Sequence, residues 1–112
     1  MKKIKIILVA LVGVLIVSCD STTVQEIQPV VTNPTYNSNI KAIMSAKCVS
    51  CHSSNGQNPA LTNYAEVKDA IENGSLECRI QNDCGAIMPP SGKMPQVFID
   101  MINNWKVQGY VE

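Results

Sequence analysis

Several kinds of pattern are missing from this 112-residue sequence. No stretch alternates apolar and polar residues strongly enough to predict a β-strand, and no segment repeats. Basic and acidic residues are equal in number, nine of each, which excludes the strongly cationic face that binds nucleic acid. The chain has one histidine, His52, so no second histidine can act as an acid or base beside it. These absences favour a small all-α protein.

The single histidine follows two cysteines in the order Cys48-x-x-Cys51-His52. Two thiols three positions apart on a helical turn can each add to a vinyl group of one porphyrin. The imidazole beside them then lies beneath the iron. Loose CxxC pairs are common, whereas CxxCH is the attachment signature of a c-type haem. The sequence therefore predicts one covalent haem c on Cys48 and Cys51, with His52 as the proximal iron ligand.

Residues 1–18 have the three regions of an export signal. Three lysines precede an unbroken apolar run over residues 6–17, which is short for a membrane span. Residues 15–19, LIVSC, resemble a bacterial lipobox, in which the thiol of Cys19 receives a diacylglycerol. The alternative is a plain signal peptide followed by a chance cysteine. We expect an exported protein, anchored by lipid to a bacterial membrane on its periplasmic or outer surface.

Residues 19–37 are rich in Ser, Thr, Gln, Asn and Pro and predict a flexible tether between the lipid and a domain at 38–112. Loss of the leader removes three lysines and leaves six basic against nine acidic residues, a net charge of about −3. A mildly acidic surface suits redox partners with cationic patches. We expect a monomer.

Cys78 and Cys84 form the obvious disulfide pair in an oxidising compartment. Asn82 and Asp83 between them favour a turn that brings the two Cα atoms within bonding range. Alternatively, these cysteines stay reduced and only pack. A second alternative combines all four cysteines of the domain in a structural zinc site, although five residues separate the second pair, where two to four are usual.

Helical spacing of apolar residues predicts a helix at each end of the domain. The first covers residues 39–48, with Asn37 or Ser38 as its cap, and the last covers residues 95–108. The apolar residues of these two helices are Ile40, Ile43 and Met44 in the first and Phe98, Met101, Ile102 and Trp105 in the last. We expect the two helices to touch, with Met44 against the aromatic residues of the last helix.

Two shorter helical segments lie between them. One starts after Thr62 or Asn63 and ends at an Asn-Gly pair, and Asn63 and Glu66 have the spacing of a capping box. Its apolar stripe contains Tyr64, Val67, Ala70 and Ile71. The other is a short helical turn from Leu76, followed by the disulfide loop.

A haem iron held by one histidine has an open sixth position, for which methionine is the natural candidate. Met1 leaves with the signal, and Met44 and Met101 lie on core stripes. Met88 and Met94 remain, and both precede a proline in a rigid, non-helical segment. Either can also be a core filler.

Residues 37–110 resemble a small bacterial single-haem cytochrome c (class I-like) through four segments: CVSCH, LTNYAEVKDAIENGS, IMPPSGKMP and NNWKVQG. The resemblance implies a helical domain around one haem, with Met88 rather than Met94 as the distal ligand. It also implies that the carbonyl of Pro59 bonds the His52 ring, although Pro59 can equally be only a turn residue. Ile40 stands where many members of this family have glycine, and Met44 where they have an aromatic residue.

Three further residues are weighed as partners of a haem propionate: Tyr64, Arg79 and Trp105. An aromatic residue on a helical stripe, such as Tyr64 or Trp105, is more often part of the core than a propionate ligand. An arginine such as Arg79 is more often a solvated surface charge. With both axial positions filled, no substrate reaches the metal, so the sequence predicts an electron carrier of redox proteins and no enzyme. Without methionine ligation the same haem would allow sensing or peroxidase-like chemistry.

Overall fold

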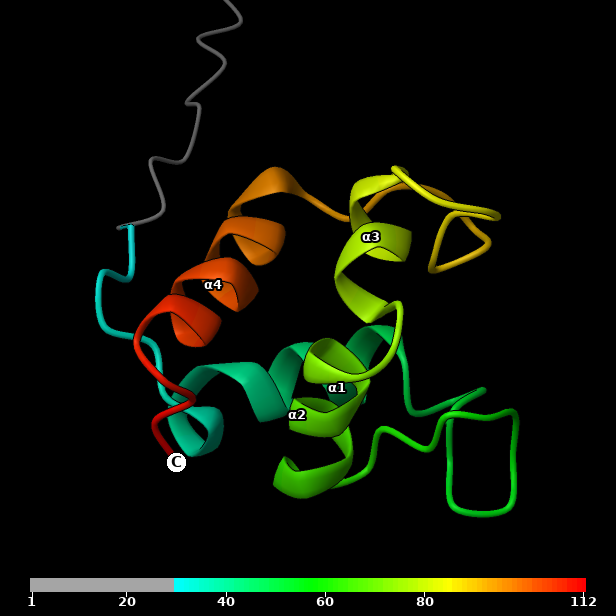
Figure 1. The fold of residues 1–112 in the computed structure, drawn as a ribbon, viewed down its shortest axis with the longest axis horizontal. Helices are drawn as coiled ribbons and strands as arrows, with labels where there is room; N and C mark the ends of the chain where they lie inside the picture. Colours follow the sequence, from blue (N-terminus) through cyan, green and yellow to red (C-terminus); the bar gives the residue numbers. More distant parts are fainter. Residues whose placement is uncertain (1–29) are drawn as a thin grey trace, which may run out of the picture.

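The computed structural model describes residues 30–112, so the export signal, Cys19 and residues 19–29 of the expected tether lie outside the described residues. This region contains a π-helical turn and four α-helices and no strand (Figure 1). The elements in chain order are η1 (Tyr36–Ile40), α1 (Lys41–Lys47), α2 (Tyr64–Glu72), α3 (Leu76–Gln81) and α4 (Gln96–Val107). The expected all-α class is confirmed for residues 30–112. Within the same residues, no helix has the length and apolarity needed to cross a membrane.

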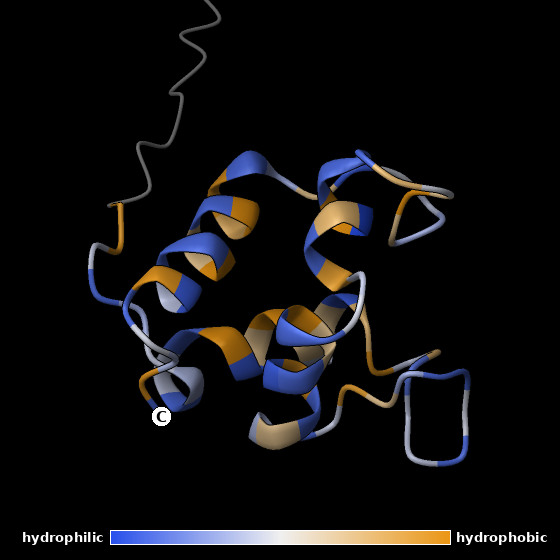
Figure 2. Ribbon diagram, in the orientation of Figure 1, coloured by the Kyte–Doolittle hydropathy of each residue, from blue (hydrophilic) through white to orange (hydrophobic). Residues whose placement is uncertain are grey.

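One apolar core receives side chains from every helix. Figure 2 shows the apolar residues on the sides of α1, α2, α3 and α4 that face one another. The largest completely buried side chains are Trp105, Ile40, Met44, Ile99, Ile102, Val67 and Pro34. Full burial of an aliphatic or aromatic side chain contributes about 1.5–3 kcal/mol, so these residues dominate the stability of the helical array.

The first helix begins earlier than expected. Thr35, and not Asn37 or Ser38, is its cap: the Thr35 hydroxyl accepts from the Ser38 amide at 3.2 Å. The Ile40 amide reaches back to the Thr35 carbonyl at 3.2 Å, which widens the first turn into a π-helical one. Tyr36 is only 4% exposed. The folded region therefore extends further toward the amino terminus than residue 38.

Four aromatic rings hold the two ends of this region together. Trp105 is the centre, with its ring centroid 5.9 Å from Tyr36, 5.9 Å from Tyr64 and 4.9 Å from Tyr110. The Trp105 indole N–H donates to the Val111 carbonyl at 2.7 Å, and the Tyr64 hydroxyl donates to the Tyr110 carbonyl at 2.9 Å. Both polar groups are thus committed to the carboxyl-terminal turn, and the suggestion that Tyr64 or Trp105 bonds a propionate is not supported.

Helix α4 is rotated from its expected face. Ile99, Ile102 and Trp105 are its buried residues, whereas Phe98 and Met101 are only half-buried. The amino-terminal elements do meet α4: the Tyr36 ring of η1 packs against Trp105, and Met44 lies in the same core cluster as Trp105. Ile40 stands at the place where the family resemblance has glycine. Its side chain is completely buried, so the core has room for its bulk.

Candidate functional site

The CxxCH motif continues the last turn of α1. The Cys48 amide donates to the Met44 carbonyl at 2.8 Å, so the helix extends into the motif. The amides of Cys51 and His52 both return to the Cys48 carbonyl, at 3.1 and 2.9 Å. The backbone therefore places the two cysteines and the histidine on a single tight turn.

Neither cysteine of this turn is in a disulfide. Cys51 is exposed and Cys48 is half-buried. Burial raises the pKa of the Cys48 thiol above its ordinary value, so this sulfur stays protonated and does not behave as an activated thiolate. Both thiols of the turn are outside any disulfide, and the Cys51 thiol is the more exposed of the two.

The His52 ring is oriented by the loop that follows it. Its Nδ1 lies 2.7 Å from the Pro59 carbonyl oxygen and 3.2 Å from that of Gln57. Because a carbonyl can only accept, Nδ1 is the donor in this contact, and in the Nδ1–H tautomer of the neutral ring Nε2 carries the lone pair. The contact with Pro59 that the family resemblance implied is present.

Residues 53–61 close this loop onto the motif. The Gln57 amide donates to the Cys51 carbonyl at 2.8 Å, and the Leu61 amide donates to the His52 carbonyl at 2.9 Å. Gly56 permits the approach, because a Cβ atom there would lie 2.3 Å from the Cys51 carbonyl oxygen. Leu61 is 4% exposed and fixes the far end of the loop in the core. The Pro59 carbonyl is consequently held in place by bonds on both sides of it.

Helix α2 begins directly after this loop and braces it. The Asn63 side chain caps α2 by accepting from the Glu66 amide at 3.0 Å, as expected. The Glu66 carboxylate does not return to Asn63, as a reciprocal capping box requires, but accepts from the amide and the hydroxyl of Thr62, both at 2.7 Å. These bonds hold the pKa of Glu66 below its ordinary value.

The expected disulfide is present between Cys78 and Cys84, whose Cα atoms are 5.5 Å apart. A four-cysteine zinc site needs four free thiolates, and two are consumed by this bond. Within residues 30–112, no group of three or more His, Cys, Asp or Glu side chains is arranged to hold a metal ion. With Cys78 and Cys84 joined, the described part of the chain does not offer the four thiolates of the zinc alternative.

The two candidate methionines have different environments. Met94 is 5% exposed and belongs to the core, whereas Met88 is half-buried in the segment between α3 and α4. The Met88 amide donates to the Arg79 carbonyl at 3.1 Å. In Figure 1 this segment lies at the upper right beside α3, and the loop after His52 lies at the lower right beyond α2. Met88 thus has the more accessible thioether of the two.

The Arg79 side chain has a role that the sequence did not reveal. Its Nη1 donates to the Ala86 carbonyl at 2.9 Å, so the side chain is anchored on its own chain and is not a free surface charge, although the other N–H groups of the guanidinium remain able to donate. Gly85 lies directly against the guanidinium group. The sequence offered one local signal for this contact. Arg79 follows Cys78 and Gly85 follows Cys84, so a disulfide between the two cysteines brings Arg79 and Gly85 together.

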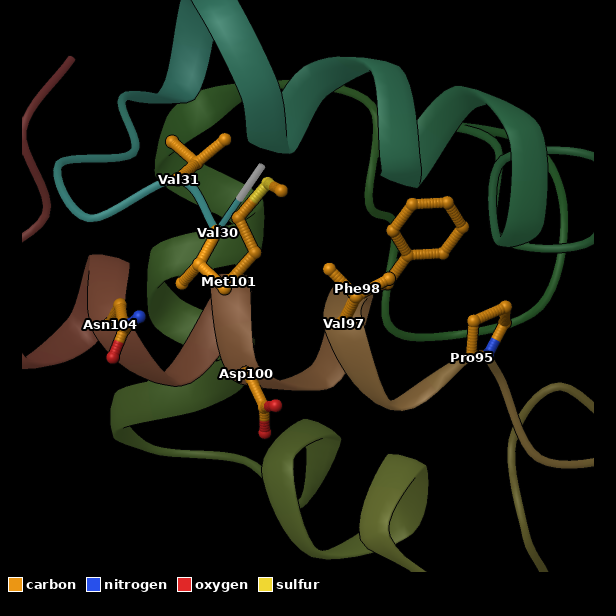
Figure 3. A pocket seen from close by; sticks show the side chains of 8 residues that line it. All are labelled: Val30, Val31, Pro95, Val97, Phe98, Asp100, Met101 and Asn104. Atoms are coloured by element: carbon orange, nitrogen blue, oxygen red, sulfur yellow. The ribbon is translucent and has the colours of Figure 1, made fainter. Parts of the chain in front are cut away.

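A groove of about 530 Å³ lies along α4 on its half-buried side (Figure 3). Phe98 and Met101 project into it from α4, and Val30 and Val31 form its other wall. Neither His52 nor Met88 lines it, so the groove is separate from the candidate iron ligands.

Comparison of the chain with protein-family models, with curated proteins and with solved structures finds no match.

Proposed function

We propose that this protein is a small electron carrier of cytochrome c type, with one haem c attached through Cys48 and Cys51 and His52 as its proximal ligand. The observation that carries the proposal is the bond from His52 Nδ1 to the Pro59 carbonyl. A histidine that binds a metal characteristically donates its other ring N–H to a fixed acceptor, which sets the ring orientation and raises its basicity. An unpaired surface histidine needs no such arrangement.

The donor set fits a covalent haem. Two thiols outside any disulfide share one helical turn with an imidazole whose Nδ1 is engaged by a carbonyl, so that Nε2 is the nitrogen that would bind an iron. The other two cysteines of residues 30–112, Cys78 and Cys84, are joined to each other, so the free state of the CxxC thiols is not shared by every cysteine that the structure describes. The haem, when bound, would supply one iron that takes up and gives back one electron.

Met88 is the residue we propose for the distal position. Its side chain is half-buried, whereas Met94 already contributes its thioether to the core and would have to leave it to bind a metal. If His52 and Met88 both held the iron, no coordination site would be left for a substrate, and the chain supplies no second histidine as an acid or base. Such a pair of ligands would support electron transfer without substrate turnover.

The location of the carrier is part of the proposal. An export signal over residues 1–18 and lipidation of Cys19 would tether the domain to a bacterial membrane, where it would exchange electrons with redox proteins. The disulfide between Cys78 and Cys84 supports an oxidising compartment, because such bonds are rare in the cytosol.

The deciding experiment is the intact mass of the protein made in a host that has the haem-ligation machinery. We expect one haem per chain and a red colour that survives denaturing extraction. The double variant Cys48→Ser with Cys51→Ser should carry no covalent haem, whereas the matched double variant Cys78→Ser with Cys84→Ser should keep it. A wild-type mass equal to that of the polypeptide and its acyl chains would contradict the proposal.

A further inference from the structure

We infer that Arg79 and the Cys78–Cys84 disulfide form a clamp that sets the position of Met88, and that Arg79 is a positioning residue for this candidate ligand. The inference deepens the proposed function and rests on it wherever it concerns the iron. The clamp consists of three links between helix α3 and the segment 84–88 that follows it: the disulfide, a main-chain hydrogen bond and a side-chain hydrogen bond.

Helix α3 is the fixed part of the clamp. Its residues Leu76 and Ile80 are 8% and 3% exposed and lie in the common core. The Arg79 amide donates to the Ser75 carbonyl at 3.0 Å, so Arg79 belongs to the regular part of the helix. A group bonded to Arg79 is thereby tied to the core.

The main chain returns from α3 alongside the helix. Asn82 ends α3 with a left-handed conformation, φ 67°, which asparagine tolerates better than most residues. The Asp83 amide then donates to the Cys78 carbonyl at 2.8 Å, and the disulfide fixes Cys84 beside the same turn. This return allows the Met88 amide to reach the Arg79 carbonyl at 3.1 Å.

The Arg79 side chain fastens the middle of the segment. Its guanidinium donates to the Ala86 carbonyl at 2.9 Å. A Cβ atom on Gly85, whose φ is +57°, would lie 2.7 Å from Nη1 of Arg79, so glycine leaves room for the guanidinium. Arg79 therefore bonds the segment twice, through its carbonyl at Met88 and through its side chain at Ala86.

Few other interactions hold this segment. Gly85 and Ala86 are exposed, and Ile87 and Met88 are only half-buried. A thioether is a weak acceptor on a side chain with three rotatable bonds, so Met88 has no strong polar contact of its own to fix the sulfur. A segment with little buried apolar surface opens at low free energy unless other bonds restrain it. The clamp supplies this restraint.

The test is competition with imidazole in the ferric holoprotein, followed by the optical spectrum. Added imidazole must displace the Met88 sulfur, so a looser segment lets it bind more tightly. We expect Arg79→Ala to lower the imidazole Kd about tenfold, which corresponds to about 1.4 kcal/mol. Cys78→Ser with Cys84→Ser should lower it at least as much, because the return of the chain is then unconstrained.

Glu77→Gln is the matched control. Glu77 lies on the same helix and forms an ion pair with Lys106, so its loss loosens α3 against α4 but leaves the clamp intact. Its imidazole Kd should stay within about twofold of the wild-type value. If Arg79→Ala differs from Glu77→Gln by less than about threefold, Arg79 only stabilises the helix and the inference is overturned.

A second readout is independent of iron ligation. Amide hydrogen exchange at Met88 in the same proteins should accelerate by about tenfold in Arg79→Ala and remain near the wild-type rate in Glu77→Gln. Unchanged protection in Arg79→Ala overturns the clamp. A wild-type protein that carries haem without methionine ligation, but shows the expected exchange, contradicts Met88 as a ligand and leaves the clamp standing.

Discussion

The two segments that would supply axial ligands are positioned in different ways. His52 is oriented by its own side chain, through the Nδ1 bond to the Pro59 carbonyl. Met88 has no comparable bond, and the structure holds it through its main-chain amide and through its neighbour Ala86. An imidazole has two nitrogens, one for orientation and one for a metal, whereas a thioether has a single weak acceptor.

The two segments also differ in how they are closed: a disulfide contributes to the segment that leads to Met88, whereas hydrogen bonds close the loop after His52 without a covalent link. The loop after His52 closes through hydrogen bonds over a few residues and ends at the buried Leu61. The segment before Met88 is largely exposed, and a disulfide from Cys78 to Cys84 acts together with hydrogen bonds where it returns alongside α3. The loop at His52 is thus held by hydrogen bonds and a buried end, whereas the segment at Met88 combines hydrogen bonds with a covalent link.

The largest expected effect separates the two ligands themselves. His52→Ala should lower the yield of haem-bearing protein by about tenfold or more, because the proximal nitrogen is lost. Met88→Ala should keep a wild-type yield and lose only the weak long-wavelength band of methionine-bound ferric haem. The measurements are the ratio of haem to protein and the ferric spectrum. Equal losses of haem in both variants would break the comparison.

A second pair of variants sharpens the choice of methionine. Met94→Ala removes a side chain that is 5% exposed, so the free energy of unfolding should fall by about 2–5 kcal/mol. The long-wavelength band should remain. Denaturant unfolding and the ferric spectrum together test this, with Met88→Ala as the matched variant. Loss of the band in Met94→Ala and its retention in Met88→Ala would transfer the distal role to Met94.

A pair of glycines tests whether the loop orients His52. In Gly56→Ala the new methyl group would meet the Cys51 carbonyl, which should cost about 1–3 kcal/mol and displace the loop. The exchange of the His52 Nδ1 proton, observed by NMR, should accelerate. Gly92→Ala is the control for a loss of stability without a clash. Its φ of +134° disfavours alanine, but no atom lies within 4 Å of the new methyl group. An unchanged His52 proton in Gly56→Ala would show that the loop does not depend on this close approach.

The sequence predicted helix α2 well because its signals agreed with one another. Asn63 is a cap followed by regular helical spacing, and the structure begins the helix at Tyr64. For the first helix the sequence predicted Asn37 or Ser38 as the cap, and the structure uses Thr35, a residue of the same capping class that local preference does not separate from them. The burial of Tyr36 against Trp105 decides the choice, and this contact joins distant parts of the chain.

The face of α4 was ambiguous for a related reason. The run Val97-Phe98-Ile99 offers an apolar residue at every position, so the stripe can be drawn through Phe98 or through Ile99. Packing selects Ile99, and Phe98 is left at the groove. At the candidate site, the motif identified Cys48, Cys51 and His52 from their spacing alone. The sequence offered Arg79 only as a candidate propionate partner, and its hydrogen bond to the Ala86 carbonyl could not be predicted, because Ala86 lies across a disulfide turn.

The smallest expected effect concerns acid and the His52 side of the comparison. Hydrogen bonds from Thr62 hold the Glu66 pKa below its ordinary value, so the ionised form stabilises the folded state. This contribution is present above the pKa of the unfolded chain, about 4.3, and is lost as the pH falls from there through the lower folded pKa. Glu66→Gln should remove that part of the acid dependence of the free energy of unfolding, which denaturant titrations across this range would measure. The Thr62 amide, which bonds Glu66, directly follows Leu61, and the Leu61 amide bonds the His52 carbonyl. Acid that breaks the Glu66 contacts should therefore loosen the loop after His52. We expect exchange of the His52 Nδ1 proton to accelerate at a higher pH than exchange of the Met88 amide. Simultaneous loss of protection at both sites would mean that the two segments open as one unit.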